Sequence, residues 1–368
     1  MTDYQRRLQR MLNAVHMKPV DKIPVSYNGP AYLAKEMGLT IGEYVSDFKK
    51  ATDAAVAFLR KHPGIDSIHS PIIDPRCLSL LWLSPVLMPG IDLPEDELWQ
   101  VIEKETMTED DYEIILKEGF GPWSAQIMKD RLGDPLSKME PFFRYEKVCY
   151  QRIHEAGYPV MNPVSSATPF EHLCGGRTLM NFFVDLVDDP EYILEVSEKI
   201  MEHDLASLKQ TLTENQPISL WIGGWRSAPE LLSHDTWMEF VWPNLKKAIT
   251  TTVDMGAIPI LHFDSCWNRE LEILKELPPR KCILMLDGST DIHLAREILD
   301  DRMCIMGDVP AQMLAFGTED DVYRYATGLI RDIGPKTGYI VSSGCDVPLN
   351  ARPENVAAMI QAACDYAV

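Results

Sequence analysis

Short runs of apolar and β-branched residues recur along this chain, and longer stretches with helical periodicity lie between most of them. Stretches such as 190–212, 234–256 and 290–301 repeat apolar residues at the spacing of an amphipathic helix. Strands that alternate with helices pair in parallel, so the pattern predicts a series of βαβ units. The runs that we expect to form strands are 22–27, 66–71, 218–224, 257–264, 281–288, 302–309 and 337–344.

The number of these units indicates a barrel. Five strand–helix steps fall between residues 218 and 345, and the first half of the chain supplies at least two more. Eight such units in one domain are typical of an α/β fold of the (β/α)8 TIM barrel type, and a doubly wound open sheet is the main alternative. No GxGxxG or P-loop motif follows any expected strand, which removes the usual nucleotide-binding reason for an open sheet. We therefore predict a single barrel domain over residues 1–368, with an acidic insertion around 89–119.

Charge and composition narrow the range of partners. The formal net charge is −20 at pH 7, whereas nucleic acids and anionic membrane surfaces require clustered Lys and Arg, so we expect neither as a partner. No apolar run approaches the roughly 20 residues of a membrane-spanning helix, and residues 1–25 lack the apolar core of a signal peptide. The eight cysteines are scattered without a CxxC pair, which is typical of reduced thiols in a cytoplasmic protein. A homodimer remains one option for the assembly.

In a barrel of this kind, functional residues lie where the strands end and the βα loops begin. A single polar residue at the end of a strand is often only the cap of the next helix. Several polar residues at the same rim indicate a functional site more strongly than any one of them does. The residues that the sequence places at this rim are Tyr27, Asn28, His69, Trp225, Arg226, His262, Asp264, Asp287, Asp308, Cys345 and Asp346.

Three of the rim residues form a candidate metal site. His262 and Asp264 are two positions apart, and side chains at i and i+2 of a strand share one face. Cys345 ends the last expected strand, which reaches the same rim if the barrel is closed. An imidazole nitrogen, a carboxylate oxygen and a thiolate suit zinc and leave a fourth position open for a substrate. The alternative is a hydrogen-bonded structural His and a Cys that only packs.

Three segments carry a resemblance to a known family. They are PVDKIPVS at 19–26, DDRMCIMGDVPAQMLAFGTEDDVYRYATGLI at 300–330 and SSGCDVPLNARPENVAAMI at 342–360. With these segments, nearly the whole chain resembles the uroporphyrinogen decarboxylase superfamily. The resemblance implies a (β/α)8 barrel.

The resemblance favours one branch of that superfamily over another. The decarboxylases carry two arginines in the loop after the first strand and a His in the turn after the last strand. Here the loop SYNGPAYLAKEMG offers only Lys35, and Cys345 occupies the turn. The corrinoid-linked methyltransferases instead bind zinc with a His-x-Cys pair and a Gly-Cys turn. This chain matches that pattern at His262 and at Gly344-Cys345, but Asp264 replaces the first Cys.

The methyltransferase resemblance implies a specific activity. A zinc-dependent enzyme would move a methyl group from a small methoxylated compound, expected to be aromatic, to a separate corrinoid protein, which is the first step of O-demethylation. The chain has no DxHxxG motif of its own, so the cobalamin would come on that partner. A carboxylate ligand makes zinc harder and better suited to oxygen than to sulfur. The open alternatives are methyl transfer from a corrinoid to a thiol, a decarboxylase, and a metal-free ligand-binding homologue.

The remaining rim residues are expected to form the pocket. Asp287, Asp308 and His69 are candidates for catalytic or supporting roles around the metal. Trp82 and Trp221 either pack in the core or reach the mouth, and Arg226 could instead form an ion pair with Asp287 or Asp308. Few cations and many aromatic side chains suit a flat, neutral substrate. The expected substrate-binding residues are Tyr27, Asn28, Tyr32, Phe170, Trp225 and Arg226.

Overall fold

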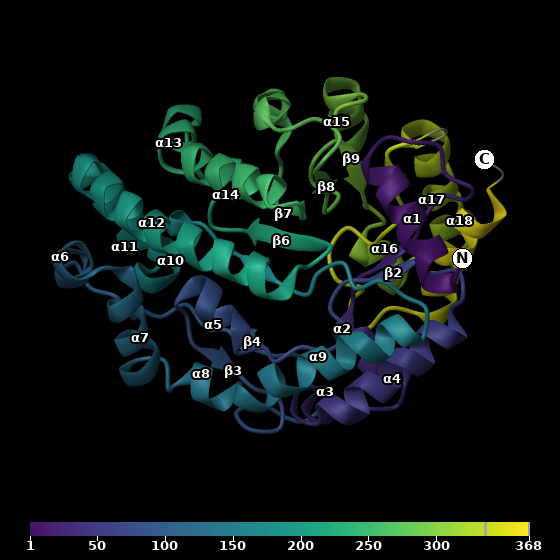
Figure 1. Ribbon diagram of the computed structural model, residues 1–368, viewed down its shortest axis with the longest axis horizontal. Coiled ribbons are helices and arrows are strands. Elements are labelled where there is room, and N and C mark those ends of the chain that lie inside the picture. Colours follow the sequence, from purple (N-terminus) through teal and green to yellow (C-terminus); the bar gives the residue numbers. More distant parts are fainter. Residues whose placement is uncertain (335–336, 367–368) are drawn as a thin grey trace.

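Eight short parallel strands form a closed barrel in the computed structural model, which describes residues 1–334 and 337–366, apart from the side chain of Phe263. Six strands form one sheet in the order β10-β9-β8-β7-β6-β5, and β1 pairs with β2. Parallel bridges from Val25 to Val341 and from Ile68 to Val160 join the two sheets into a ring. The predicted (β/α)8 barrel is therefore confirmed (Figure 1). The barrel strands are β1 (Ser26–Tyr27), β2 (Ser67–Ile68), β5 (Ser165–Ser166), β6 (Ser219–Gly224), β7 (Ile258–Phe263), β8 (Ile283–Met285), β9 (Cys304–Met306) and β10 (Tyr339–Ile340).

Helices connect successive strands. Strands β8 and β9 are fully buried, as expected for parallel strands that are covered by helices. The connection from β7 to β8 consists of 3-10 turns, and the other connections contain α-helices. The helical elements outside the long β2–β5 connection are α1 (Asp3–Val15), α2 (Pro30–Glu36), α3 (Ile41–Ser46), α4 (Phe48–Lys61), α9 (Glu140–Glu155), α10 (Pro169–Arg177), α11 (Leu179–Asp188), α12 (Pro190–Asn215), η1 (Pro229–Leu231), α13 (His234–Phe240), α14 (Trp242–Asp254), η2 (Asn268–Glu270), η3 (Glu272–Glu276), α15 (Ile292–Leu299), α16 (Ala311–Phe316), α17 (Glu319–Ile333) and α18 (Pro353–Asp365).

One barrel strand, β5, was not among the expected strands. Its two residues are both serine, and its segment is interrupted by Pro159 and Pro163. Neither composition nor length gives the apolar alternation by which a strand is recognised. The strand exists because β6 supplies its pairing, and the preceding Val160 bridges to Ile68 of β2.

The long connection between β2 and β5 contains the predicted acidic segment and extends beyond it. An antiparallel hairpin and several helices leave the barrel there, and Figure 1 shows α6 and α7 at the opposite end of the long axis from α17 and α18. Ahead of α9, the elements of this connection are α5 (Cys77–Trp82), β3 (Val86–Leu87), β4 (Gln100–Val101), α6 (Asp110–Glu118), α7 (Phe120–Asp130) and α8 (Pro135–Lys138). Among the described residues, no helix is long and apolar enough to cross a bilayer.

The alternation along β1 and β2 decides which side chains face the barrel lumen. The ring of Tyr27 lies 4.5 Å from that of Phe58 on α4, so Tyr27 faces the helix layer. Ser26 therefore faces the lumen, because successive strand residues point to opposite faces. Ser67 pairs with Ser26 and donates a hydrogen bond to its Oγ at 2.8 Å. His69 lies two positions beyond Ser67 and points to the same side.

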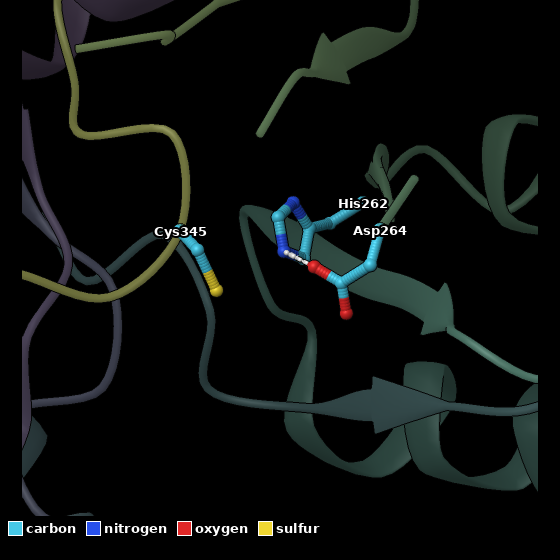
Figure 2. A group of neighbouring side chains, drawn as sticks. All are labelled: His262, Asp264 and Cys345. Atoms are coloured by element: carbon cyan, nitrogen blue, oxygen red, sulfur yellow. Dashed lines mark ion pairs between the residues drawn. The ribbon is translucent and has the colours of Figure 1, made fainter. Parts of the chain in front are cut away.

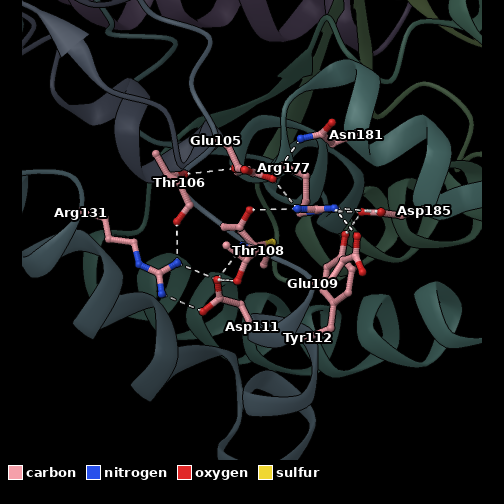
Figure 3. Close-up of polar contacts among 12 residues, drawn as sticks. Glu105, Thr106, Thr108, Glu109, Asp111, Tyr112, Arg131, Arg177, Asn181 and Asp185 are labelled. Carbon is pink, nitrogen blue, oxygen red and sulfur yellow. Dashed lines mark hydrogen bonds and ion pairs between the residues drawn. The ribbon is translucent and has the colours of Figure 1, made fainter.

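Arg177 ties the acidic segment to the barrel helices (Figure 3). Its Nε donates to Asp185 Oδ2 at 2.7 Å and its Nη2 to Asp185 Oδ1 at 3.0 Å, while the hydroxyl of Tyr112 donates to the same carboxylate at 2.6 Å. The guanidinium also contacts Glu105 and Glu109 of the acidic segment. The side chains of Arg177 and Asp185 are only 6% and 8% exposed, so each needs the other as its counter-charge.

Replacing Arg177 with Met should lower the free energy of unfolding by about 3–5 kcal/mol, because the buried Asp185 carboxylate would lose its counter-charge. Urea denaturation measures the change. Arg324 is a suitable control because it pairs with Asp320 and Asp321 at the surface, where its side chain is 67% exposed. Arg324→Met should leave stability nearly unchanged, and an equal loss in the two variants would contradict the structural role of Arg177.

Candidate metal centre

The structure brings His262, Asp264 and Cys345 together at the C-terminal ends of the strands. Their ligand atoms all lie within 4.8 Å of one another, and His262 Nε2 is 3.5 Å from Asp264 Oδ1. Figure 2 shows the thiol of Cys345 pointing from its own loop toward the imidazole of His262. Ligand atoms around a tetrahedral zinc lie about 3.3–3.8 Å apart, so small side-chain rotations would bring the three into coordination. The donor set and the spacing both fit zinc.

Backbone contacts hold the two parts of this cluster in register. The amide of Gly344 donates to the carbonyl of Val309 at 2.9 Å, and a Cβ on Gly344 would lie 2.6 Å from the carbonyl oxygen of Asp287. Glycine at 344 therefore lets the segment that carries Cys345 approach the end of β8.

Asp287 positions the loop that carries Asp264. Its Oδ2 accepts a hydrogen bond from the amide of Ser265 at 2.9 Å, and Ser265 has a φ of +77°. Its Oδ1 accepts from the amide of Ser289 at 2.8 Å. Both carboxylate oxygens are thus engaged in fixing loops, which makes Asp287 a support for Asp264.

The electrostatics of His262 reflect its two partners. Burial alone would lower the pKa of the imidazole, but hydrogen bonds and charges from Asp264 and Cys345 outweigh it and raise the pKa to about 10. The site is therefore built to stabilise positive charge, as a cation site must be. Asp264 is 43% exposed and Cys345 is also open to solvent, so the cluster can be reached from the barrel mouth.

Trp221 lies beside the cluster. Its ring centroid is 6.0 Å from that of His262, and the residue is partly exposed. Gly223 pairs with His262 in the adjacent strand, and a Cβ at Gly223 would lie only 2.2 Å from the Trp221 ring. The indole thus occupies the space that a side chain at 223 would fill. Of the two roles that the sequence allowed for Trp221, core packing or a place at the mouth, the structure favours the mouth.

Asn28 and Asp346 line the mouth next to the cluster. The side chain of Asn28 hydrogen-bonds Asp346, and the carbonyl of Asn28 accepts from the amide of Val347 at 2.8 Å. Asp346 is exposed, yet desolvation of its carboxyl by the surrounding protein raises the pKa to about 6, and the charge of His262 opposes this rise. The sequence placed Asp346 at the rim without a role, and its proximity to His262 identifies it as part of the site.

Arg226 is buried away from the two aspartates with which the sequence allowed it to pair. Its guanidinium carbon lies 4.2 Å from the centroid of Trp225 and 5.7 Å from that of Trp82. Burial lowers the pKa of Arg226, and the buried carboxylate of Glu171 is the main charge that offsets this. Glu171, a residue that the sequence reasoning missed, also accepts hydrogen bonds from the amide and hydroxyl of Ser227.

Three expected substrate-binding residues point elsewhere. Tyr27 faces α4, and Phe170 packs against Phe182 of α11 with ring centroids 5.0 Å apart. Tyr32 is buried on α2. Burial is the main cause that raises the pKa of its hydroxyl, and the charges of Glu36 and Glu354 raise it further. The structure does not bring these three aromatic side chains to the mouth, because strand alternation and helix packing turn them toward the helix layer.

Asp308 also departs from its expected place. Its Oδ1 accepts a hydrogen bond from the hydroxyl of Tyr325 on α17 at 2.9 Å, so the carboxyl faces the helix layer. Burial raises its pKa to about 6. A role next to the metal ligands does not follow from this geometry.

Comparisons with known proteins identify the family. The uroporphyrinogen decarboxylase (URO-D) family model matches residues 160–366, more than half of the chain, and the chain belongs to this family. The uroporphyrinogen decarboxylase of Chlorobium phaeobacteroides is 28% identical over 142 residues, and that of Syntrophotalea carbinolica is 22% identical over 171 residues. These alignments cover 37% and 46% of this chain, and 38% and 48% of the two relatives.

A solved structure extends the likeness to the whole fold. A methyltransferase from Methanosarcina mazei superposes with a TM-score of 0.74 and covers 99% of each chain at 16% identity. At this identity the likeness concerns the fold. It supports the closed barrel over the full length, including the half of the chain that the family model does not match.

Gly223→Ala should lower the free energy of unfolding by about 1–3 kcal/mol, because the new methyl group would overlap a packed ring and a backbone atom. The two atoms that it meets are in the Trp221 ring and the His262 carbonyl, at 2.2 and 2.5 Å. Denaturant unfolding followed by tryptophan fluorescence measures the loss. Gly328→Ala is the control, since a Cβ there meets nothing within 4 Å. Equal stability in the two variants would contradict the packing described for Trp221.

Proposed function

We propose that this protein is a zinc-dependent methyltransferase that transfers a methyl group from a methoxylated aromatic compound to a separate corrinoid protein, the first step of O-demethylation. The observation that carries the proposal is the convergence of His262, Asp264 and Cys345 at the barrel mouth. Membership of the URO-D family and the fold of the methanogen methyltransferase are consistent with it.

The ligand chemistry favours an oxygen substrate. One thiolate, one imidazole and one carboxylate make a harder zinc site than a set with two thiolates. Zinc bound there would polarise the ether oxygen and stabilise the negative charge that it gains as the methyl group leaves. In the transfer, the O–CH3 bond breaks, oxygen keeps its electron pair, and the methyl carbon bonds to the reduced cobalt of the corrinoid protein.

The residues around the cluster suit an aromatic methyl donor. Trp221 presents a partly exposed ring beside His262, and an aromatic substrate can stack on such a ring while its oxygen faces the metal ligands. Asn28 offers an amide at the same mouth. The exposure of Asp264 and Cys345 leaves the mouth accessible to a second protein, as cobalamin carried by a partner requires.

The alternatives make different demands on the same residues. Methyl transfer to a thiol favours a sulfur-rich zinc site, and Asp264 counts against it. A decarboxylase needs cations to clamp several carboxylates. Segment 28–37, which contains α2, carries only Lys35, whose Nζ donates to the carbonyl of Leu349. Decarboxylation is the second candidate function, because the two relatives described above are both uroporphyrinogen decarboxylases.

After reconstitution with zinc, the wild-type protein should hold one zinc per chain, and His262→Ala and Cys345→Ala should hold substoichiometric zinc, because each removes one of three protein ligands. Elemental analysis of the dialysed proteins measures this. Cys364→Ala is the matched control, since Cys364 is also exposed but lies outside the cluster. A wild-type protein without zinc would refute the proposed mechanism.

The activity itself can be followed at the cobalt. With a reduced corrinoid protein and an aryl methyl ether, the zinc-loaded protein should convert the cobalt spectrum to that of the methylated form, and Cys345→Ala should not. Uroporphyrinogen is tested separately, as the substrate of the alternative decarboxylase activity. Release of carbon dioxide from it, with no cobalt methylation from any ether in the panel, would establish the decarboxylase instead.

A further inference from the structure

His69 is an anomaly in the barrel lumen. Its side chain is fully buried, and neither Nδ1 nor Nε2 has a hydrogen-bond partner among the described residues. Buried polar groups in proteins are nearly always hydrogen-bonded, because an unpaired one costs free energy. A histidine kept only for packing would therefore be a poor choice at this position.

The position of His69 directs it toward the metal cluster. Ser26 and Ser67 lie side by side on the strand face that lines the lumen. His69 is two residues beyond Ser67 and therefore lies on the same face. Its amide donates to the carbonyl of Tyr27 at 2.9 Å, which fixes the backbone at the end of β2. It is close enough to His262 for the charge of His262 to lower its pKa.

Burial favours the uncharged form of the His69 ring. Burial, followed by the charge of His262, lowers its pKa to about 3. A neutral imidazole offers one N–H donor and one acceptor nitrogen. It is thus suited to a neutral oxygen group, such as an ether or a hydroxyl.

We propose that His69 binds an oxygen of the methyl donor within the lumen, as a hydrogen-bonding residue that orients the substrate beside His262, Asp264 and Cys345. This inference rests on the proposed function, because it takes a methoxylated aromatic compound as the ligand. It assigns to His69 recognition of the substrate, separate from coordination of the metal.

The test compares binding of 2-methoxyphenol by calorimetry in the zinc-loaded wild type and in His69→Leu. Loss of one hydrogen bond at a buried position should weaken binding by about 10- to 100-fold. Zinc content should stay unchanged, and the melting temperature without ligand should stay equal or rise, because Leu removes two unpaired polar atoms. His69→Gln should recover part of the affinity, since its amide can also donate and accept.

Ser67→Ala is the matched control. Ser67 lies on the same lumen face and is equally buried, but its hydroxyl is paired with Ser26. The substitution should lower the melting temperature slightly and leave the affinity unchanged. Methoxybenzene serves as a second probe: if His69→Leu weakens it as well, the contact is to the ether oxygen, and if only 2-methoxyphenol is weakened, the contact is to the hydroxyl.

Wild-type affinity in His69→Leu would overturn the assignment, as would loss of zinc from that variant, which would make His69 a support of the metal. A fall in melting temperature without a change in affinity would show a purely structural role. If the wild-type protein binds neither probe, the proposed function fails together with this inference, whereas equal affinity in wild type and His69→Leu refutes the role of His69 alone.

Discussion

The parallel pairing that closes the barrel is the constraint on which the candidate site depends. The bridge between Val25 and Val341 joins the last strand to the first, and the bridge between Val309 and Ser343 extends the pairing of β10 with β9 toward the mouth. Cys345 follows this ladder directly, so closure carries it to the end of β7, where His262 and Asp264 lie. Strands β10 and β7 are three positions apart in the sheet, so a flat sheet would hold their ends roughly 14 Å apart. Closure of the barrel brings the thiolate across the mouth, so that the three ligand atoms lie within 4.8 Å of one another.

Closure also imposes the alternation that divides the side chains into two sets. On β1, Tyr27 turns to α4, whereas Ser26 faces the lumen, and on β2 His69 shares the lumen with Ser67. Polar groups in such a lumen are costly unless something binds them. The hydroxyls of Ser26 and Ser67 hydrogen-bond to one another, whereas neither ring nitrogen of His69 has a partner among the described residues. A ligand that hydrogen-bonds His69 would remove this unfavourable free energy.

Much of this arrangement could be predicted from the sequence because it depends on strand periodicity. The barrel, the rim position of His262 and Asp264 and the arrival of Cys345 follow from runs of apolar residues and from spacing by two. Strand β5 escaped prediction because Ser165 and Ser166 carry no apolar signal, and its existence depends on pairing with distant segments.

The directions of individual side chains at the rim could not be predicted in the same way. Phe170 lies in a helix whose residues are all buried, and its orientation is set by Phe182 on the next helix. Arg226 is buried, and the charge of Glu171 offsets the effect of that burial on its pKa. Tertiary packing brings these two residues near one another, and no local motif marks Glu171. Trp221 could be placed beside His262 only once the register of β6 against β7 and the clearance over Gly223 were known.

The most direct test of the metal centre is X-ray absorption at the zinc edge of the reconstituted protein. The account predicts one sulfur ligand at about 2.3 Å, from Cys345, and the remaining nitrogen and oxygen ligands at about 2.0–2.2 Å. The sulfur contribution should disappear in Cys345→Ala. Two sulfur ligands, or none, in the wild-type protein would contradict the ligand set on which the proposed chemistry rests.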